Sequence, residues 1–523
     1  MIDVDRPFSR VLVANRGEIA VRIIRTCREM GMETVAVYSD PDRHAGHVRI
    51  ADMAVRLGPA PASESYLAAD AIVRAALATG AQAIHPGCGF LAERASFAAA
   101  VESAGLTFVG PDSQTIAALG DKLAARRIAR SVDVPVVPGT LEPASTASPE
   151  GVARIIEAAR ELGYPLFVKA AAGGGGRGMR RVTRPDDLPS ALAAGSNEAE
   201  ATFGDGAVYL EREIRPARHI EVQLLGDAAG RVVAIGERDC SIQRRHQKLV
   251  EEAPAAGLSA AQRQQVHALA IRIASKAGLG NAATAEFLCD RDGRFWFLEM
   301  NTRLQVEHGV TELVSGLDLV REQFWLAAGA PLSAGALAAA EHAAAPNGHA
   351  IEVRISLEDP ARAFAPIAGR VGRFRLAAGP GLRVDTALEP GERVPPDYDP
   401  LVAKLMVHAA DRPMAIDRLR RALDETEIDG VQTTLPFHRF VAESAAFRSG
   451  DLSTDFVETY WDGPAVRRAA VRRALLAAGL AFFEPVPTAL PVSLAGSPAE
   501  PHRPAGSTWL AVARAEGIDR WPG

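Results

Sequence analysis

A predicted β-hairpin with a carboxylate on each arm constrains the fold of this chain more than any other segment. Two apolar, aromatic arms at 285–289 and 294–298 flank the segment that contains Asp292-Gly293, a residue pair typical of a two-residue turn. If these two residues form the turn, the pairing places Glu286 directly opposite Glu299. Facing side chains lie about 5 Å apart between Cβ atoms, where like charges destabilise the pair, so this arrangement calls for a cation between them.

Alternation along the second arm adds a third oxygen ligand. It places Asn301 on the same face as Glu299. A small set of oxygen ligands suits Mg²⁺ or Mn²⁺ that also holds substrate phosphates. The alternative is an exposed hairpin with two solvated glutamates. The segment therefore predicts a divalent-metal site at Glu286, Glu299 and Asn301.

Length and composition exclude several classes of protein. The chain has 523 residues, 48% of them hydrophobic, which is too long for one ordinary core and predicts about three domains. A net charge of −6 argues against nucleic acid as the main ligand. The N-terminus is acidic and lacks signal-peptide character, and no apolar run reaches the roughly 20 residues of a membrane span. The scattered Cys27, Cys88, Cys240 and Cys289 form no CxxC motif and predict reduced thiols in a cytoplasmic protein.

The N-terminal third has the pattern of alternating strands and helices. A short apolar strand at 11–14 precedes an amphipathic helix at 19–30 and a second strand at 34–38. This βαβ unit predicts a parallel sheet. A helix at 66–79 and strands at 83–85 and 108–111 continue the pattern. This N-terminal βαβ unit lacks GxGxxG, so a dinucleotide site there has little support.

A glycine-rich loop follows a predicted strand at 165–170. Four consecutive glycines, Gly173 to Gly176, forgo side-chain packing, but they offer backbone N–H groups that can close over phosphate oxygens, with charge from Lys169 and Arg177. The spacing differs from a Walker-type P-loop. The alternative is a flexible surface loop, but the flanking strands favour a mobile lid over nucleotide. Lys122, at the start of a helix running to about residue 131, carries little weight by itself.

A short basic run precedes the hairpin. Arg244, Arg245, His246 and Lys248 fall within five residues of a chain that is acidic overall. Such runs are usually solvated, but the position of this one between a strand and the metal hairpin favours an anion site.

The C-terminal part changes character twice. An alanine-rich stretch at 327–346 marks a domain boundary. Beyond it, a strand at 348–355 carries Arg354 on the same side as Glu352, and hairpins, a strand at 398–407 and a helix at 413–426 predict an α+β domain. From about residue 460 the sequence predicts a short helix with two Arg-Arg pairs at 467–468 and 472–473, then a Pro/Ala-rich linker at 485–504.

Taken together, the motifs resemble biotin carboxylase, the ATP-grasp component of biotin-dependent carboxylases. The resemblance covers about residues 8 to 460, and no block of it is repeated elsewhere. The segments that carry it are ANRGEIA at 14–20, HPG at 85–87, GFL at 89–91, Lys169 with the loop 173–179, ERDCSIQRRHQKLVEE at 237–252 and EMNTRLQVEH at 299–308.

The resemblance implies an α/β and α+β fold in several parts. These are a Rossmann-like N-terminal domain (1–121), an ATP-grasp domain (122–330) with a mobile lid at about 141–213, a C-terminal α+β biotin carboxylase domain (345–460) and an extension (461–523). It implies a two-step reaction in which ATP and bicarbonate form carboxyphosphate, and N1′ of biotin on a carrier protein is then carboxylated. The implied ligands are ATP, Mg²⁺ or Mn²⁺, bicarbonate and carrier-bound biotin.

The same resemblance implies roles for individual residues. Contacts to ATP are implied for Lys122, Lys169, Gly175, Gly176, Glu211, Arg212, Ile214, His219, Gln243 and His246. Bicarbonate and biotin would be held by Lys248, Arg303, Gln305, Val306 and Arg354, with Glu307 as the base and Arg354 stabilising the biotin enolate. The metal ligands would be Glu286, Glu299 and Asn301, the same residues that the hairpin pairing indicates. Joining two anions requires cations to offset their repulsion and fixed donors to align them.

The chain departs from the family pattern at two positions. Cys88 stands where an aromatic residue is usual, which alters one wall of the biotin pocket. Gly309 stands where proline is usual, a change expected to have a smaller, backbone effect.

No Ala-Met-Lys-Met biotinylation sequence is present. The carrier is therefore expected to be a separate polypeptide, unless the chain is a fragment, and carboxyltransferase subunits would complete a complex around a homodimer. The segment 507–521 faintly resembles the linker of longer acyl-CoA carboxylase α-chains. Nucleic acid and membrane are not expected as partners.

Three other interpretations remain. An ATP-grasp ligase joining a carboxylate to an amine is disfavoured by the RRHQK and NTRLQVEH segments. Carbamoyl-phosphate synthetase is disfavoured because its large chain duplicates the ATP-grasp block. A catalytically silent assembly subunit is disfavoured because the charged set at Lys248, Glu286, Glu299, Arg303, Glu307 and Arg354 is complete.

Overall fold

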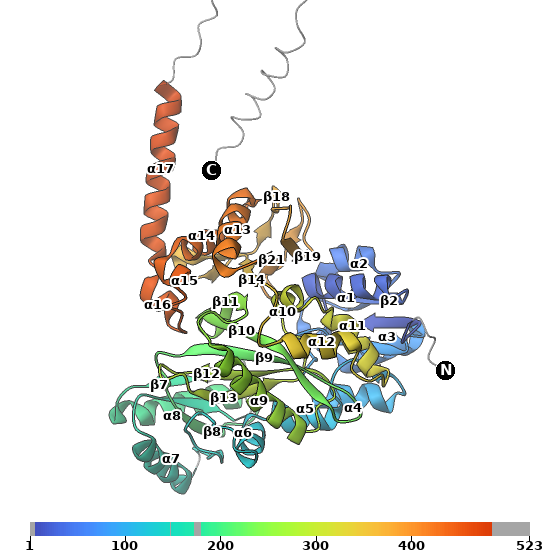
Figure 1. The fold of residues 1–523 in the computed structure, drawn as a ribbon, viewed down its shortest axis with the longest axis vertical. Helices are drawn as coiled ribbons and strands as arrows, with labels where there is room; N and C mark the ends of the chain where they lie inside the picture. The colour runs from blue at the N-terminus through green and yellow to red at the C-terminus, as the bar shows by residue number, and fades with distance from the viewer. Residues whose placement is uncertain (1–5, 147, 172–178, 484–523) are drawn as a thin grey trace, which may run out of the picture. The chain divides into compact units, whose positions relative to one another are not determined.

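The structure, a computed structural model, describes residues 6–146, 148–171 and 179–483. Gly175, Gly176 and the predicted linker at 485–504 lie outside these residues. The described residues divide into two compact units, one within 6–360 and 364–461 and the other within 361–363 and 462–483. The first unit contains the sheets and helices that position the charged residues (Figure 1).

The N-terminal part is a five-stranded parallel sheet, as the βαβ pattern predicts. Its strands lie in the order β3-β2-β1-β4-β5. Alternate residues of β1 face opposite layers: Val11 and Val13 pack with helix α1, whereas Leu12 packs with helices α3 and α4. The bounds are β1 (Arg10–Val13), α1 (Gly17–Glu29), β2 (Glu33–Ser39), α2 (Gly46–Ile50), β3 (Met53–Gly58), α3 (Ala69–Thr79), β4 (Ala83–His85), α4 (Ala95–Ser103), β5 (Thr107–Phe108) and α5 (Ser113–Gly120).

An eight-stranded antiparallel sheet forms the centre of the first unit. Its order is β13-β12-β9-β10-β11-β14-β21-β19. The sheet continues through the β11–β14 pairing, so strands on both sides of the alanine-rich stretch belong to it. The bounds are β9 (Arg218–Gly226), β10 (Val232–Arg244), β11 (Gln247–Ala253), β12 (Asn281–Cys289), β13 (Phe295–Asn301), β14 (His349–Ser356), β19 (Leu382–Thr386) and β21 (Leu401–Ala409).

A smaller three-stranded sheet, in the order β7-β6-β8, lies within the segment predicted as a lid. Helices α7 and α8 share its apolar core, which includes Ile155, Ala159, Leu166, Val168 and Leu192. The bounds are α7 (Pro149–Leu162), β6 (Leu166–Ala170), β7 (Arg180–Val182), α8 (Leu188–Phe203) and β8 (Val208–Arg212).

Further helices and short strands cover the large sheet. The alanine-rich stretch contains helix α12, whose Ala336 and Ala339 pack into the core that also holds α1 and α11. The helices are α6 (Lys122–Ser131), α9 (Ala260–Lys276), α10 (His308–Ser315), α11 (Leu319–Ala327), α12 (Ala334–His342), α13 (Arg412–Glu425), α14 (Leu435–Glu443), α15 (Ala445–Ser449) and α16 (Phe456–Tyr460). The short strands are β15 (Glu358–Asp359), β16 (Ala365–Pro366), β17 (Gly369–Arg370), β18 (Phe374–Arg375), β20 (Arg393–Val394) and β22 (Glu427–Ile428).

The second unit contains α17 (Gly463–Phe483). This helix has 21 residues and carries both Arg-Arg pairs, so the prediction of a short helix there is wrong in length. The reason is local: from Ala465 the segment consists almost entirely of alanine, leucine, valine and arginine, and most of these residues have high helix propensity.

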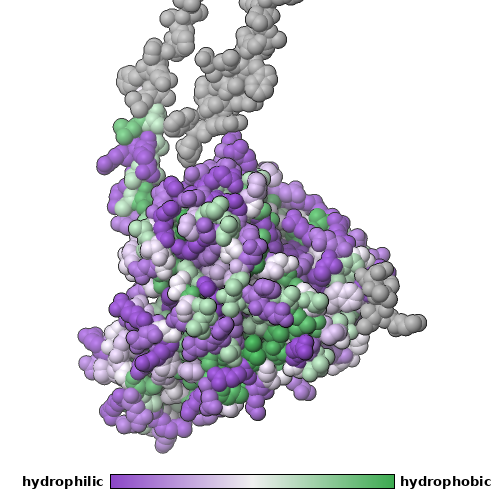
Figure 2. All heavy atoms as spheres, in the orientation of Figure 1, coloured by the Kyte–Doolittle hydropathy of each residue, from purple (hydrophilic) through white to green (hydrophobic). Residues whose placement is uncertain are grey.

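The face of the protein shown in Figure 2 is mostly hydrophilic, and the cysteines are unpaired. Figure 2 shows that hydrophilic side chains cover most of the face in view and that hydrophobic ones gather in patches between them. All four cysteines are free thiols, as predicted. Among the described helices, none has the length and hydropathy needed to span a bilayer.

Candidate active site

The hairpin forms, and Glu286 of β12 lies directly opposite Glu299 of β13. The predicted two-residue turn is nevertheless wrong, because Asp290 pairs with Arg294 around a three-residue loop. The Asp290 carboxylate holds that loop by accepting bonds from the backbone N–H groups of Asp292 and Arg294, each at 3.0 Å, and Gly293 supplies the required positive φ of 76°. A β-bulge next to the Glu286 rung then restores the register.

The facing glutamates belong to a longer row of charges across the sheet. Glu221 of β9 lies opposite Glu286, and Arg238 of β10 lies opposite Glu221. Three carboxylates and one guanidinium thus occupy one row across four neighbouring strands. Sequence reasoning missed Glu221, although it lies two residues after His219 on an alternating strand and so shares its face.

Lys248 neutralises this row from β11. Its Nζ donates to Glu286 Oε1 at 3.0 Å, to Glu307 Oε1 at 2.6 Å and to Glu221 Oε2. Burial by itself lowers the pKa of Lys248, but the three carboxylates outweigh burial and raise it well above its usual value. The ammonium is therefore charged at every working pH and holds together residues from four elements.

The pKa values of two of these carboxylates are lowered. Burial favours the neutral form of Glu286, but Lys248 and His219, whose Nε2 lies 3.0 Å from Glu286 Oε2, lower its pKa. Burial also opposes ionisation of Glu307, and Lys248, Arg354 and Arg238 together lower the pKa of Glu307 well below its usual value. Both carboxylates are consequently ionised near neutral pH.

The four cations of the basic run do not form one cluster. The tight β10–β11 turn gives Arg245 and His246 positive φ values and leaves both exposed. Arg244 lies 5.1 Å from the ring centroid of Phe364, and only Lys248 reaches the carboxylates. The prediction of a four-cation anion site is therefore wrong, because strand alternation and the turn direct neighbouring side chains apart.

The loop after β13 presents Arg303 between several acceptors. Its Nε donates to Glu93 Oε2 at 2.8 Å, and its Nη1 donates to Gln305 Oε1 at 2.8 Å. Asn301 Nδ2 donates to Glu286 Oε1 at 2.7 Å, which joins this loop to the charged row. Glu93 was missed because it lies 210 positions from Arg303 in the chain, although it is only two residues after the GFL motif.

Glu307 and Arg354 meet at the start of α10. Arg354 Nη2 donates to Glu307 Oε2 at 3.0 Å, so both oxygens of Glu307 are held by cations. The backbone beside them is fixed by Lys404 of β21, whose Nζ donates to the Val306 carbonyl at 2.8 Å and lies 3.1 Å from Glu18.

A second charged group lies toward the lid. Glu211 of β8 is buried and accepts hydrogen bonds from Arg126 of α6 and Lys169 of β6. Lys122 Nζ, at the start of α6, lies 2.6 Å from Glu299 Oε2 and connects this group to the charged row. Arg126 was missed, since nothing local distinguishes it from other helix arginines.

The remaining residues with implied ATP contacts are less closely grouped. Gln243 is buried on β10 opposite Lys248. The ring centroids of His246 and Phe167 lie 6.4 Å apart. Arg212 is exposed at the end of β8, and Ile214 is half-buried just beyond it.

The turn around Cys88 has a defined structure. Asn15 Nδ2 donates to the carbonyls of Pro86 at 2.7 Å and Cys88 at 2.8 Å. Gly87 has a φ of 68°, and a Cβ there would lie 2.7 Å from Asn15 Nδ2, so glycine is required. Burial raises the pKa of the Cys88 thiol to about 12, which keeps it protonated.

The absence of a side chain at Gly309 leaves space for the neighbouring Met406, so this position affects packing as well as the backbone. A Cβ at this position would lie 2.3 Å from Met406 Sδ, closer than any real contact. Met406 thus fills the space that a proline ring would need.

Gly309→Ala is expected to lower the free energy of unfolding by about 1–3 kcal/mol, because overpacking outweighs the gain of up to about 1 kcal/mol in helix propensity. Denaturant unfolding measures this. Gly335→Ala in α12 is the matched control, since its Cβ would meet only ordinary contacts at 3.5 and 3.6 Å and should leave stability unchanged or raised. Equal effects of the two substitutions would contradict the packing argument.

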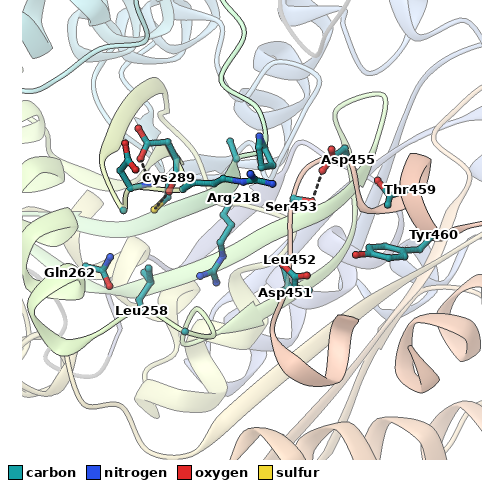
Figure 3. A pocket seen from close by; sticks show the side chains of 17 residues that line it. Arg218, Leu258, Gln262, Cys289, Asp451, Leu452, Ser453, Asp455, Thr459 and Tyr460 are labelled. Carbon is teal, nitrogen blue, oxygen red and sulfur yellow. Dashed lines mark hydrogen bonds between the residues drawn. The ribbon is translucent and has the colours of Figure 1, made fainter. Parts of the chain in front are cut away.

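Lys248 and the carboxylates that it contacts do not line the cavity shown in Figure 3. That cavity, of about 490 Å³, lies between the start of β9, the β12–β13 loop and residues 451–460. None of the residues predicted from the sequence to bind ATP, metal, bicarbonate or biotin lines it. The candidate active site is therefore identified by its charged side chains and their contacts, and it does not coincide with this cavity.

The residues on the hairpin fit a hard divalent cation. Glu286, Glu299 and Asn301 supply only oxygen ligands from adjacent strands. Among the described residues, the ligand atoms within 4.8 Å of one another are those of His219, Glu221 and Glu286, and those of Glu221, Cys240 and Glu307. Glu299 is in neither group, because its carboxylate is turned to Lys122.

The fold and site define the class of the protein first. Residues 121–335 match the family described as the carbamoyl-phosphate synthase L chain, ATP binding domain. Residues 7–116 and 352–459 match the biotin carboxylase N-terminal and C-terminal domains. A nucleotide-binding domain of the ATP-grasp type therefore lies between two domains of a carboxylase.

Individual relatives then identify the family. The chain is 46% identical over 451 residues to the biotin carboxylase of Pseudomonas aeruginosa, covering 86% of this chain and 98% of that protein. It is also 46% identical over 459 residues to the biotin-dependent acyl-coenzyme A carboxylase alpha3 subunit of Mycobacterium leprae, covering 87% of this chain and 75% of the relative. The chain belongs to the biotin carboxylase family, as its motifs predict.

A solved structure supports the same assignment. The biotin carboxylase domain dimer of Hydrogenobacter thermophilus 2-oxoglutarate carboxylase, in complex with MgADP, ADP and bicarbonate, matches with a TM-score of 0.82 and 43% identity. The match covers 88% of this chain and 98% of that domain. The predicted fold class, with a parallel N-terminal sheet, an ATP-grasp domain and a C-terminal α+β domain, is confirmed.

Proposed function

We propose that this chain is the biotin carboxylase subunit of an acyl-CoA carboxylase and that it uses ATP and bicarbonate to carboxylate biotin on a separate carrier protein. The observation that carries the proposal is the Lys248 ammonium, held by Glu221, Glu286 and Glu307, with Arg354 bound to the same Glu307. This grouping places a proton acceptor among fixed cations, as the joining of two anions requires.

In the first step, a bicarbonate oxygen attacks the γ-phosphorus of ATP, ADP leaves, and carboxyphosphate forms. Glu307 is ionised and accepts the bicarbonate proton. Lys248, which donates to Glu307, and Arg303, whose charge interacts with Glu307, supply positive charge for that acceptor. A metal held by Glu286, Glu299 and Asn301 would offset phosphate charge when bound.

In the second step, the bond between the carboxyl group and phosphate in carboxyphosphate breaks, the carboxyl group is transferred to N1′ of biotin, and the departing phosphate takes up the N1′ proton. The family resemblance assigns to Arg354 the positive charge that stabilises the biotin enolate, and the Arg354 guanidinium lies beside the base, Glu307. Cys88 forms part of the biotin wall in place of an aromatic ring.

The residues proposed to contact ATP come from the predicted lid and from neighbouring segments of the ATP-grasp domain. The lid spans about 141–213, between an N-terminal domain at 1–121 and the rest of the ATP-grasp domain to residue 330, and the C-terminal domain covers 345–460. The proposed ATP contacts are Lys122, Lys169, Gly175, Gly176, Glu211, Arg212, Ile214, His219, Gln243 and His246, with Gln305 and Val306 beside bicarbonate.

The proposed partners are a biotin carboxyl carrier protein, carboxyltransferase subunits and a second copy of this chain. The relative from Mycobacterium leprae is named as a subunit of an acyl-coenzyme A carboxylase, and the solved domain of Hydrogenobacter thermophilus is described as a dimer. Co-purification followed by assays with acetyl-CoA, propionyl-CoA, pyruvate and 2-oxoglutarate separates an acyl-CoA acceptor from a 2-oxo acid acceptor.

Incubating the purified chain with Mg-ATP, labelled bicarbonate and free biotin is expected to produce carboxybiotin together with ADP and phosphate. The reason is that Lys248, Arg303, Glu307 and Arg354, the charged groups proposed for the two steps, belong to one connected set of hydrogen bonds. Acid-labile label on biotin is the measurement, and omission of ATP is the control. Nucleotide binding without carboxybiotin above that control would contradict the proposal and favour a silent subunit.

A further inference from the structure

Two glutamates near Arg354 have no role in the two proposed reaction steps. Glu251 of β11 and Glu352 of β14 are directly opposite one another in the antiparallel pairing, and both are fully buried. Like charges on facing residues destabilise a sheet, and the cost rises when water is excluded. Two ionised carboxylates in this position would be strongly unfavourable.

The partners of the two residues differ. Glu251 Oε1 accepts a hydrogen bond from Arg354 Nε at 2.6 Å. Glu251 Oε2 and both oxygens of Glu352 have no hydrogen-bond partner among the residues that the structure describes. A buried carboxylate without partners is far less stable than the neutral acid, so the proton belongs on Glu352.

The surrounding charges agree with this assignment. The groups that face the pair are Lys248 on β11, Cys240 on β10, Arg354 on β14, Glu307 at the start of α10 and Lys404 on β21. Burial raises the pKa of Glu352 well above its usual value, and Lys404 opposes burial only in part. Burial likewise raises the pKa of Glu251 to about 7, against the opposing effect of Arg354.

Glu251 helps to determine the orientation of the Arg354 guanidinium. The guanidinium is held at Nε by Glu251 and at Nη2 by Glu307, and its Nη1 donates no hydrogen bond to any described residue. A guanidinium fixed at two of its nitrogens keeps the third in one direction, which lowers the entropy lost when a substrate oxygen binds.

We propose that the pair carries a single negative charge, located on Glu251, and that this charge makes Glu251 a positioning residue that directs Arg354 toward biotin, while Glu352 is a neutral acid. The inference rests on the proposed function for its kinetic consequence. Once Glu251 takes up a proton on the acidic side of pH 7, Arg354 loses that hold, so kcat/KM for biotin falls with decreasing pH. ATP cleavage without biotin does not depend on this hold.

Glu251→Gln tests the proposal because glutamine has nearly the same shape and no charge. We expect kcat/KM for free biotin to fall about 10- to 100-fold, as for loss of a hydrogen bond to a charged group. The KM for ATP should stay within about threefold, and the acid limb of the biotin pH profile should disappear. Glu352→Gln should change kcat/KM for biotin less than about threefold and keep the acid limb. Equal losses in both variants, or an acid limb retained in Glu251→Gln, would overturn the proposal.

Two further measurements separate positioning from general damage. Glu251→Gln in an Arg354→Lys background should cost less than about twofold, because the residue acts through Arg354; the full loss in that background would refute the role. Glu341→Gln, on the exposed face of α12, is the control for substitution itself.

An infrared measurement does not depend on turnover. A carboxylic acid C=O band between pH 7 and 8 that is present in the unmodified protein and absent from Glu352→Gln would place the proton as proposed. Absence of that band would overturn the assignment even if biotin is carboxylated. A band in a protein that fails to carboxylate biotin would instead contradict the proposed function alone.

Discussion

Lys248→Met is expected to lower bicarbonate-dependent ATP cleavage by about 10³-fold. The ammonium is the shared partner of Glu221, Glu286 and Glu307, and methionine keeps the length of the side chain without its charge. Its loss leaves buried carboxylates without that partner, which should also lower the free energy of unfolding by about 3–5 kcal/mol. ATP cleavage with and without bicarbonate, and denaturant unfolding, measure the two effects.

The loss of stability should depend on pH in a defined direction. In the unmodified chain, Glu286 and Glu307 have pKa values below the usual 4.5, so their stabilising contribution is present above that value and lost as the pH falls further. Without Lys248 their pKa values rise, and stability is instead lost as the pH increases. The difference between variant and unmodified chain should therefore be smaller at pH 5 than at pH 8.

Lys276→Met on the exposed end of α9 is the matched control for Lys248 and should change neither ATP cleavage nor stability. If Lys248→Met retained more than about a tenth of the bicarbonate-dependent activity, the role of Lys248 in neutralising the carboxylates would be refuted.

Glu307→Gln is expected to lower carboxybiotin formation by about 10³-fold, because it removes the proton acceptor while keeping the size of the side chain. Lys248 still has Glu221 and Glu286 as partners in this variant, so the local fold should persist. The affinity for nucleotide should stay within about threefold. Carboxybiotin formation and equilibrium binding of ADP measure the two quantities separately.

Retention of carboxylation in Glu307→Gln would show that another group accepts the bicarbonate proton. A parallel loss of nucleotide affinity would show that Glu307 maintains the site as a whole and does not act as a base. Glu341→Gln again serves as the control for removal of one negative charge.

The local patterns of the sequence account for much of the fold. Alternating strands and helices predict the parallel N-terminal sheet, and β4 (Ala83–His85) forms at the predicted residues. The hairpin shows both the strength and the limit of such reasoning. The Glu286–Glu299 pairing is correct, but the predicted turn is one residue too short, and a bulge that spacing does not reveal compensates for it.

Contacts between distant strands could not be read from the sequence. Arg303 meets Glu93 of the N-terminal part, and Lys404 joins Val306 to Glu18. The basic run predicts four equivalent cations, yet the turn at Arg245 and His246 directs only Lys248 into the site. Local spacing gives the face of a strand on which a side chain lies, but not which strand lies beside it.

The sequence by itself determined the family, the residue types of the site and the pairing of the two hairpin glutamates, because these depend on short-range periodicity and on motifs. Only the tertiary structure decided the row Arg238–Glu221–Glu286–Glu299, the three carboxylate partners of Lys248, and the burial of Glu251 against Glu352. The physical reason is the strand order of the eight-stranded sheet. Hydrogen bonding between strands far apart in the chain brings these charges together, and exclusion of water then decides which of them remain ionised.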